Sequence, residues 1–88
     1  MQVEEITGQQ IRAARGALKW SVQRLAEQSG VGTATIVRYE DFAGVPKTRK
    51  DNLTQIISVF ESAGIEFIGS PEDAPGIRIH ARPDRPRD

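Results

Sequence analysis

The first two thirds of the chain repeat apolar residues every three or four positions, which is the spacing of one face of a helix. This pattern predicts helices over about residues 8–18, 22–29, 33–41 and 51–63. Residues 42–47, which contain glycine and proline, connect the last two helices and have room for one helical turn. The expected inward-facing residues are Ile11, Ala14, Leu18, Leu25, Ala26, Ile36, Tyr39, Leu53, Ile56, Ile57 and Phe60.

Capping residues mark the ends of these helices. Thr7 stands three residues before Gln10, the S/T-x-x-E/Q form of a capping box. Ser21 has the hydroxyl that caps a helix N-terminus, and Gly30 is suited to end the same helix. Gly64 closes the last one. The pattern and the caps therefore agree on the helix boundaries.

After Gly64 the period changes from that of a helix to that of a strand. Residues 65–68 and 77–79 alternate in the way that a half-buried antiparallel hairpin requires, with a long loop over 69–76. The last eight residues are rich in proline and charge, which predicts disorder. The expected organisation is a helical region over 1–64, a hairpin extension over 65–80 packed on the same domain, and a disordered tail over 81–88.

Composition narrows the class of protein. With 88 residues, 38% of them hydrophobic, the chain is long enough for one compact domain. It contains no cysteine, which excludes a disulfide framework and a thiolate metal site. No apolar run approaches the roughly 20 residues of a membrane-spanning helix, and the residues after Met1 lack the basic start of a signal peptide. We expect a cytoplasmic protein with no membrane partner.

The net charge of zero hides an uneven distribution. Residues 10–50 carry eight Lys and Arg against three acids, whereas both flanking segments are net acidic. A cationic half beside an anionic half permits a nucleic-acid partner, which a uniformly neutral surface would not. Solvated faces that happen to segregate are the alternative.

The segment from Val22 to Phe42 has the spacing of a helix-turn-helix. Ala26 is small where two helices approach closely, and Gly30 can adopt the positive φ that reverses the chain. Val31 is placed to bury its side chain at the turn. An ordinary pair of antiparallel helices in a small bundle remains the alternative at this point.

Seven short segments extend this pattern along most of the chain: Ile11-Arg-Ala-Ala-Arg15, Trp20-Ser21, Leu25-Ala26-Glu27, Ser29-Gly30-Val31, Ala34-Thr35-Ile36, Arg38-Tyr39-Glu40 and the Ala63-Gly64-Ile65-Glu66-Phe67 that follows Leu53. In their order and spacing, residues 7–68 resemble the lambda-repressor/Cro-like helix-turn-helix proteins, the XRE-family regulators. The resemblance implies a mainly α, five-helix DNA-binding domain, here with a short C-terminal β-hairpin, that binds a two-fold symmetric DNA site as a dimer.

The resemblance also implies a role for individual residues. The helix over 33–41 would be the recognition helix, which places its first residues in the major groove. The implied base contacts are Thr33, Ala34, Val37 and Arg38, of which Arg38 can reach a guanine edge or a phosphate. The implied phosphate contacts are Ser21, Gln23, Thr35, Lys47, Thr48, Arg49 and Lys50. Arg15 and Glu40 match a structural ion pair between the first helix and the end of the recognition helix.

Several positions depart from the family pattern. Val22 stands where many members have a phosphate-binding Gln, and Gly32 replaces the usual Ser or Thr cap. Thr33 and Ala34 are too short for the bidentate contacts that read adenine or guanine strongly. Asp41-Phe42 replaces a common Asn/Arg-Gly pair. These departures predict modest direct readout and more reliance on DNA shape.

The expected function is that of a DNA-binding transcriptional regulator, a homodimeric repressor of its own operon that binds a palindromic operator. The alternative is an antitoxin or adaptor whose protein partner binds the C-terminal hairpin. An enzyme is not expected: His80 is the only histidine, and no serine has a His/Asp partner at a recognisable spacing. No metal and no cofactor are expected. Trp20 and Tyr39 are suited to the core or, alternatively, to stacking on bases.

Overall fold

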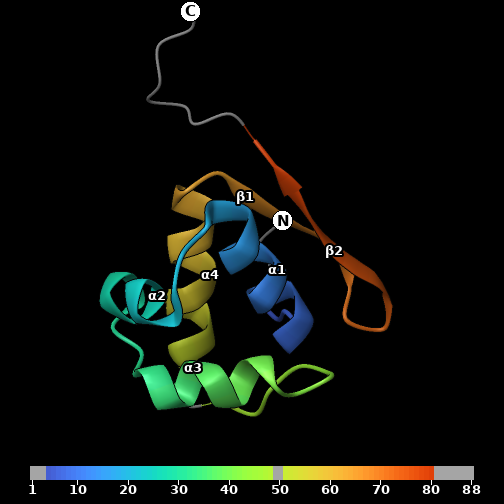
Figure 1. Ribbon diagram of the computed structural model, residues 1–88. Coiled ribbons are helices and arrows are strands. Elements are labelled where there is room, and N and C mark those ends of the chain that lie inside the picture. Colours follow the sequence, from blue (N-terminus) through green and yellow to red (C-terminus); the bar gives the residue numbers. More distant parts are fainter. Residues whose placement is uncertain (1–3, 49–50, 81–88) are drawn as a thin grey trace, which may run out of the picture.

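The computed structural model describes residues 4–48 and 51–80 and arranges them as four helices followed by a two-stranded antiparallel hairpin (Figure 1). The elements are α1 (Gly8–Leu18), α2 (Val22–Ser29), α3 (Thr33–Glu40), α4 (Asn52–Ser62), β1 (Ile65–Ser70) and β2 (Asp73–Ile79). The expected disordered tail over 81–88 lies outside the described residues. None of the described helices is long and apolar enough to cross a membrane.

The expectation of a mainly α, five-helix domain is wrong, because the described residues form a small α+β fold with four helices. Residues 42–48, which contain Gly44 and Pro46, form no helix between α3 and the segment before α4. After α4, Gly64 adopts a φ of 98° and ends the helical stretch. Ile65 and Phe67 then occupy alternate positions of a strand, and both are buried. The chain completes its core with a strand pair in place of a fifth helix.

The capping box at the start of α1 forms as the sequence predicts. The Gln10 backbone N–H donates to the Thr7 hydroxyl at 3.1 Å, and the Gln10 side-chain oxygen accepts from the Thr7 N–H at 2.8 Å. Both residues are buried, so these two bonds satisfy donors that water does not reach. The same glutamine also reaches the hairpin: its amide nitrogen donates to the carbonyl oxygen of Gly76 at 2.9 Å. Gln10 therefore fixes both the start of α1 and the position of β2.

The core lies between the four helices and one face of the hairpin. Ile6, Ile11, Leu25, Ile36, Ile56 and Phe60 are fully buried in it. The ring of Trp20 stacks on that of Phe60 at a centroid distance of 5.8 Å, and Phe67 meets Phe60 edge-on at 6.0 Å. Tyr39 is 2% exposed. Tyr39 therefore belongs to the core, and Trp20 is half-buried and packs against it.

The hairpin is longer than the sequence predicts. The strands pair Ile65 with Ile79 and Phe67 with Ile77 and continue through most of the segment expected to be a loop, so that residues 71–72 alone make the turn. The extension depends on an irregularity between Ile68 and Ser70, where Gly69 adopts a φ of 73°. The strand alternation breaks there, which is why the sequence pattern does not reveal the extra residues.

Gly8, the first residue of α1, lies against the backbone that follows α3. Its N–H donates to the carbonyl oxygen of Gly44 at 3.1 Å. A β-carbon at Gly8 would collide with the backbone oxygens of Tyr39 and Phe42, which no rotamer change can move. Glycine at this position therefore lets α1 and the end of α3 approach closely.

Replacement of Gly8 by alanine is expected to lower the free energy of unfolding by about 2–3 kcal/mol, because the clash outweighs the better helix propensity of alanine. Gly16→Ala is the matched control in the same helix, where an added β-carbon meets nothing within 4 Å. It should stabilise the protein by about 0.5–1 kcal/mol. Urea unfolding measures both values, and equal effects of the two variants would contradict the close approach.

Candidate nucleic-acid interface

The turn between α2 and α3 is built from short-range hydrogen bonds. Gly30 adopts a φ of 78° and donates its N–H to Ala26, which ends α2. The Ser29 hydroxyl then accepts the N–H of Val31 at 3.1 Å. Val31 is 4% exposed and anchors the turn in the core. These bonds set the direction in which the chain leaves α2 and enters α3.

The two faces of α3 differ sharply in burial. Ile36, Tyr39 and Glu40 point inward and are buried. The opposite face is exposed along its length, and its exposed residues are Thr33, Ala34, Val37 and Arg38. Thr35 lies between the two faces and is half-buried. The four residues for which the resemblance implies base contacts thus share one face that no other described element covers.

An ion pair fixes the end of α3 to α1. The guanidinium of Arg15 donates to both carboxylate oxygens of Glu40, at 2.8 Å and 2.9 Å. Arg15 also donates to the backbone carbonyl of Trp20 at 3.0 Å. The Glu40 side chain is only 6% exposed, so this ion pair lies in surroundings that are less polar than water. The structure thus brings together the two residues implied as a structural pair.

Arg12 supports the same junction from the preceding turn of α1. It donates to the backbone carbonyl of Glu40 at 3.1 Å, with its Nε 3.8 Å from the Glu40 carboxylate. The hydrogen bond to Glu40 raises the pKa of Arg15 above its ordinary value and so favours the charged guanidinium. Two cations from α1 therefore hold one buried carboxylate.

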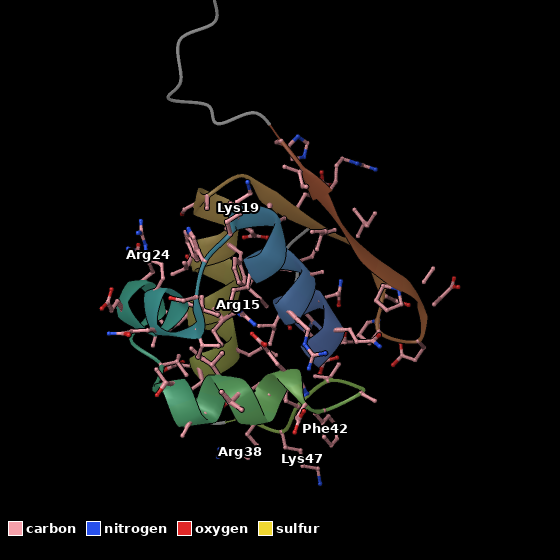
Figure 2. The ribbon with its side chains drawn as sticks, viewed as in Figure 1. Arg15, Lys19, Arg24, Arg38, Phe42 and Lys47 are labelled. Carbon is pink, nitrogen blue, oxygen red and sulfur yellow. The ribbon has the colours of Figure 1, made fainter. Side chains whose placement is uncertain are left out.

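Cationic and apolar side chains gather on the outer side of α3. Figure 2 shows Arg38, Phe42 and Lys47 projecting on this side, away from the other helices. Neither Arg38 nor Lys47 forms an ion pair with another described residue. Val37 is 53% exposed and Phe42 is 51% exposed, although both are large and apolar. We call the surface made of Thr33, Ala34, Val37, Arg38, Phe42 and Lys47 the α3 face.

An open pocket of about 410 Å³ lies at the C-terminal end of the α3 face. Its lining combines the rings of Tyr39, Phe42 and Pro46 with the side chains of Arg38 and Lys47. The Arg38 guanidinium lies 6.0 Å from the centre of the Tyr39 ring. The pocket therefore has an apolar lining and two cations, and it contains no acidic residue.

The other residues implied as phosphate contacts have separate positions. Ser21 and Gln23 are exposed at the start of α2, where the Ser21 hydroxyl accepts the N–H of Arg24 at 2.9 Å. Thr48 is half-buried after α3. Arg49 and Lys50 lie outside the described residues. Gly32 precedes α3 without a side-chain cap, in line with the departure noted in the sequence.

Phe42 is the one member of the α3 face for which sequence reasoning assigns no contact. The sequence marks Asp41-Phe42 as unusual, but periodicity alone cannot tell a buried aromatic residue from an exposed one at the end of a helix. A hydrogen bond from Asn52 to the Tyr39 hydroxyl, at 3.1 Å, is also absent from the sequence prediction. It ties the start of α4 to the inner side of α3.

Comparison with models of protein families and with curated proteins finds no match for this chain. Among residues 4–48 and 51–80, no group of three or more His, Cys, Asp or Glu side chains could hold a metal ion. The geometry of the described residues is therefore the basis for the functional proposal below.

Replacement of Arg15 by alanine should destabilise the protein by about 2–4 kcal/mol, because it leaves the Glu40 carboxylate buried with only the partial contact to Arg12. The double variant Arg15→Met/Glu40→Leu should lose less, since it removes the buried charge together with its partner. Thermal and urea unfolding of the two variants measure the difference. A double variant less stable than Arg15→Ala would contradict this account of the pair.

Proposed function

We propose that this protein is a DNA-binding transcriptional regulator of the helix-turn-helix type, which places the α3 face in the major groove of a duplex. The observation that carries the proposal is the burial pattern of α3, whose inner face is packed and locked to α1 while its outer face stays uncovered. A rigid helix with one free face, entered through a tight turn from a second helix, is the geometry that major-groove readers use.

The side chains of the α3 face are better suited to recognising DNA shape and thymine methyl groups than to forming bidentate hydrogen bonds with a base edge. Thr33 offers a hydroxyl and a methyl group, and Ala34 and Val37 offer apolar contacts to thymine methyl groups. Arg38 is the one residue of the α3 face that carries several donors in a plane, which matches either a guanine edge or a phosphate. We infer that readout combines one strong contact with sequence-dependent DNA shape.

The phosphate contacts would come from two sides of the recognition helix. Lys47 and Thr48 follow α3, and the α2 N-terminus presents Ser21 and Gln23 to solvent. Unsatisfied N–H groups and the helix dipole favour an anion at such an end. The pocket beside Phe42 and Pro46 fits a deoxyribose against its apolar lining, with Arg38 and Lys47 near the flanking phosphates.

We further propose that the protein acts in the cytoplasm as a homodimeric repressor on a palindromic site, as the resemblance to lambda-repressor/Cro-like proteins implies. A symmetric pair of recognition helices would read half-sites about one helical turn apart. No effector pocket of its own is needed for this role, since protein concentration alone sets the occupancy of the site.

The test uses a duplex that the protein enriches from a random-sequence pool. Arg38→Ala should weaken binding to this duplex by about 1–3 kcal/mol if Arg38 contacts a base bidentately, and should bring binding closer to that of a scrambled duplex. Lys47→Gln should weaken binding to both duplexes equally and reduce the slope of log affinity against log salt by about one unit. Fluorescence anisotropy over a salt series measures both effects.

Lys19→Gln is the matched control for Lys47→Gln, because Lys19 is an exposed lysine at the opposite end of the molecule in Figure 2. It should leave affinity and salt slope close to those of the unmodified protein. Failure to enrich any duplex, or DNA binding that neither Arg38→Ala nor Lys47→Gln alters, would overturn the proposal.

A further inference from the structure

The pocket at the C-terminal end of the α3 face is held in shape by hydrogen bonds. The Phe42 N–H donates to the Tyr39 carbonyl oxygen at 3.1 Å, and the Gly8 N–H donates to the Gly44 carbonyl oxygen at the same distance. Tyr39 is also fixed through its hydroxyl, which accepts a hydrogen bond from Asn52 at 3.1 Å. The segment that follows α3 is therefore anchored to α1 and to α3 itself. A pocket with fixed walls is typical of small-molecule sites.

The lining of this pocket is suited to a flat, apolar ring. Tyr39 and Pro46 are buried, whereas Phe42 is 51% exposed. A half-exposed aromatic side chain in a pocket leaves apolar area that the ring of a ligand can cover. The Arg38 guanidinium lies 6.0 Å from the centre of the Tyr39 ring, and its plane is a second surface on which a ring can stack.

Arg38 and Lys47 give the same pocket two positive charges. Both side chains are exposed, and Figure 2 shows them projecting on the same side of α3 as Phe42. Neither forms an ion pair within residues 4–48 and 51–80, and the lining includes no Asp or Glu. Cationic donors in this state favour an anionic ligand. A phosphate monoester carries a charge of about −1.5 to −2 at neutral pH, which matches two cations.

We propose that this pocket binds a small aromatic phosphate, with its flat ring against Phe42 and Pro46 and its phosphate beside Arg38 and Lys47. The pocket volume of about 410 Å³ lies within the range of about 300–1,000 Å³ that small-molecule sites occupy. A neutral ring would leave the two cations without a partner, and an inorganic anion would leave the apolar lining uncovered. The ligand that fits the whole lining therefore combines a ring with a phosphate.

A ligand in this pocket competes with DNA. Arg38 and Lys47 are also the cations that contact the duplex in the proposed complex, so this consequence rests on the proposed function. Both occupants bring phosphates to the same two side chains, which excludes simultaneous binding. By mass action the ligand then releases the protein from its DNA site. It adds a chemical signal to the control by protein concentration.

Binding is measured first without DNA. The probe is 1-naphthyl phosphate, titrated into the ¹⁵N-labelled protein at constant ionic strength. It should saturate with a Kd of about 1 mM or below. The largest amide shifts should fall on residues 38–42 and on Lys47. 1-Naphthol, which has the ring without the charge, and inorganic phosphate, which has the charge without the ring, should each bind at least about tenfold more weakly.

Two pairs of variants separate the ring from the charge. Phe42→Ala should weaken the binding of 1-naphthyl phosphate at least about fivefold. Val37→Ala is its control, because Val37 is a similarly exposed apolar residue of the α3 face outside the pocket. Arg38→Ala should also weaken binding at least about fivefold. Arg24→Ala is the control, since Arg24 likewise lies over an aromatic ring, 5.6 Å from the centre of Trp20, but does not line the pocket. Circular dichroism checks that each variant is folded.

The site is overturned if 1-naphthyl phosphate does not saturate the protein below about 10 mM, or if either control compound binds as tightly. It is also overturned if Phe42→Ala and Arg38→Ala bind the probe as well as the unmodified chain does. These measurements contain no DNA, so they decide on the pocket whether or not the proposed function holds.

Fluorescence anisotropy with the enriched duplex then tests the competition. At about ten times its Kd, 1-naphthyl phosphate should weaken DNA binding about tenfold, whereas inorganic phosphate at the same ionic strength should leave it unchanged. Saturation of the pocket with no loss of affinity for the duplex would overturn the competition.

Discussion

The contact between the Arg15 guanidinium and the buried Glu40 carboxylate is the interaction on which the arrangement of this protein depends. It joins the last turn of α1 to the last residue of α3 through two hydrogen bonds of 2.8 Å and 2.9 Å. A carboxylate that is 6% exposed is costly unless it is paired, so the fold keeps Glu40 and Arg15 together or loses stability. The inner face of α3 therefore packs in the core, and its outer face is exposed to solvent.

α1 also positions the rest of the molecule. Gly8 at its first turn allows the close approach to the backbone after α3, and Gln10 donates to carbonyls of both strands of the hairpin. One helix thus sets the position of the α3 face on one side and of the hairpin on another. The α3 face combines cations with exposed apolar groups.

The sequence predicts the local elements well and the global architecture less well. Helix boundaries follow from Thr7, Ser21 and Gly30, because caps act over three or four residues and need no tertiary contact. The fifth helix is an expectation from family resemblance, and the chain turns to a strand after Gly64. The sequence pattern does not reveal the full length of the hairpin, because the irregularity beside Gly69 breaks the alternation that marks a strand. Phe42 is not recognisable as exposed from sequence, since its exposure depends on how residues 42–48 fold back on α3.

In the proposed complex, the α3 face contacts duplex DNA. Amide chemical-shift mapping of the ¹⁵N-labelled protein tests it most directly, because one titration with an enriched duplex reports on every described backbone N–H. The largest shifts are expected on residues 21–23, 33–38 and 47–48, while Glu66, Arg78 and the rest of the hairpin should change little. Shifts concentrated on β1 and β2 with an unperturbed α3, or spread evenly over the cationic residues of α1, would contradict it.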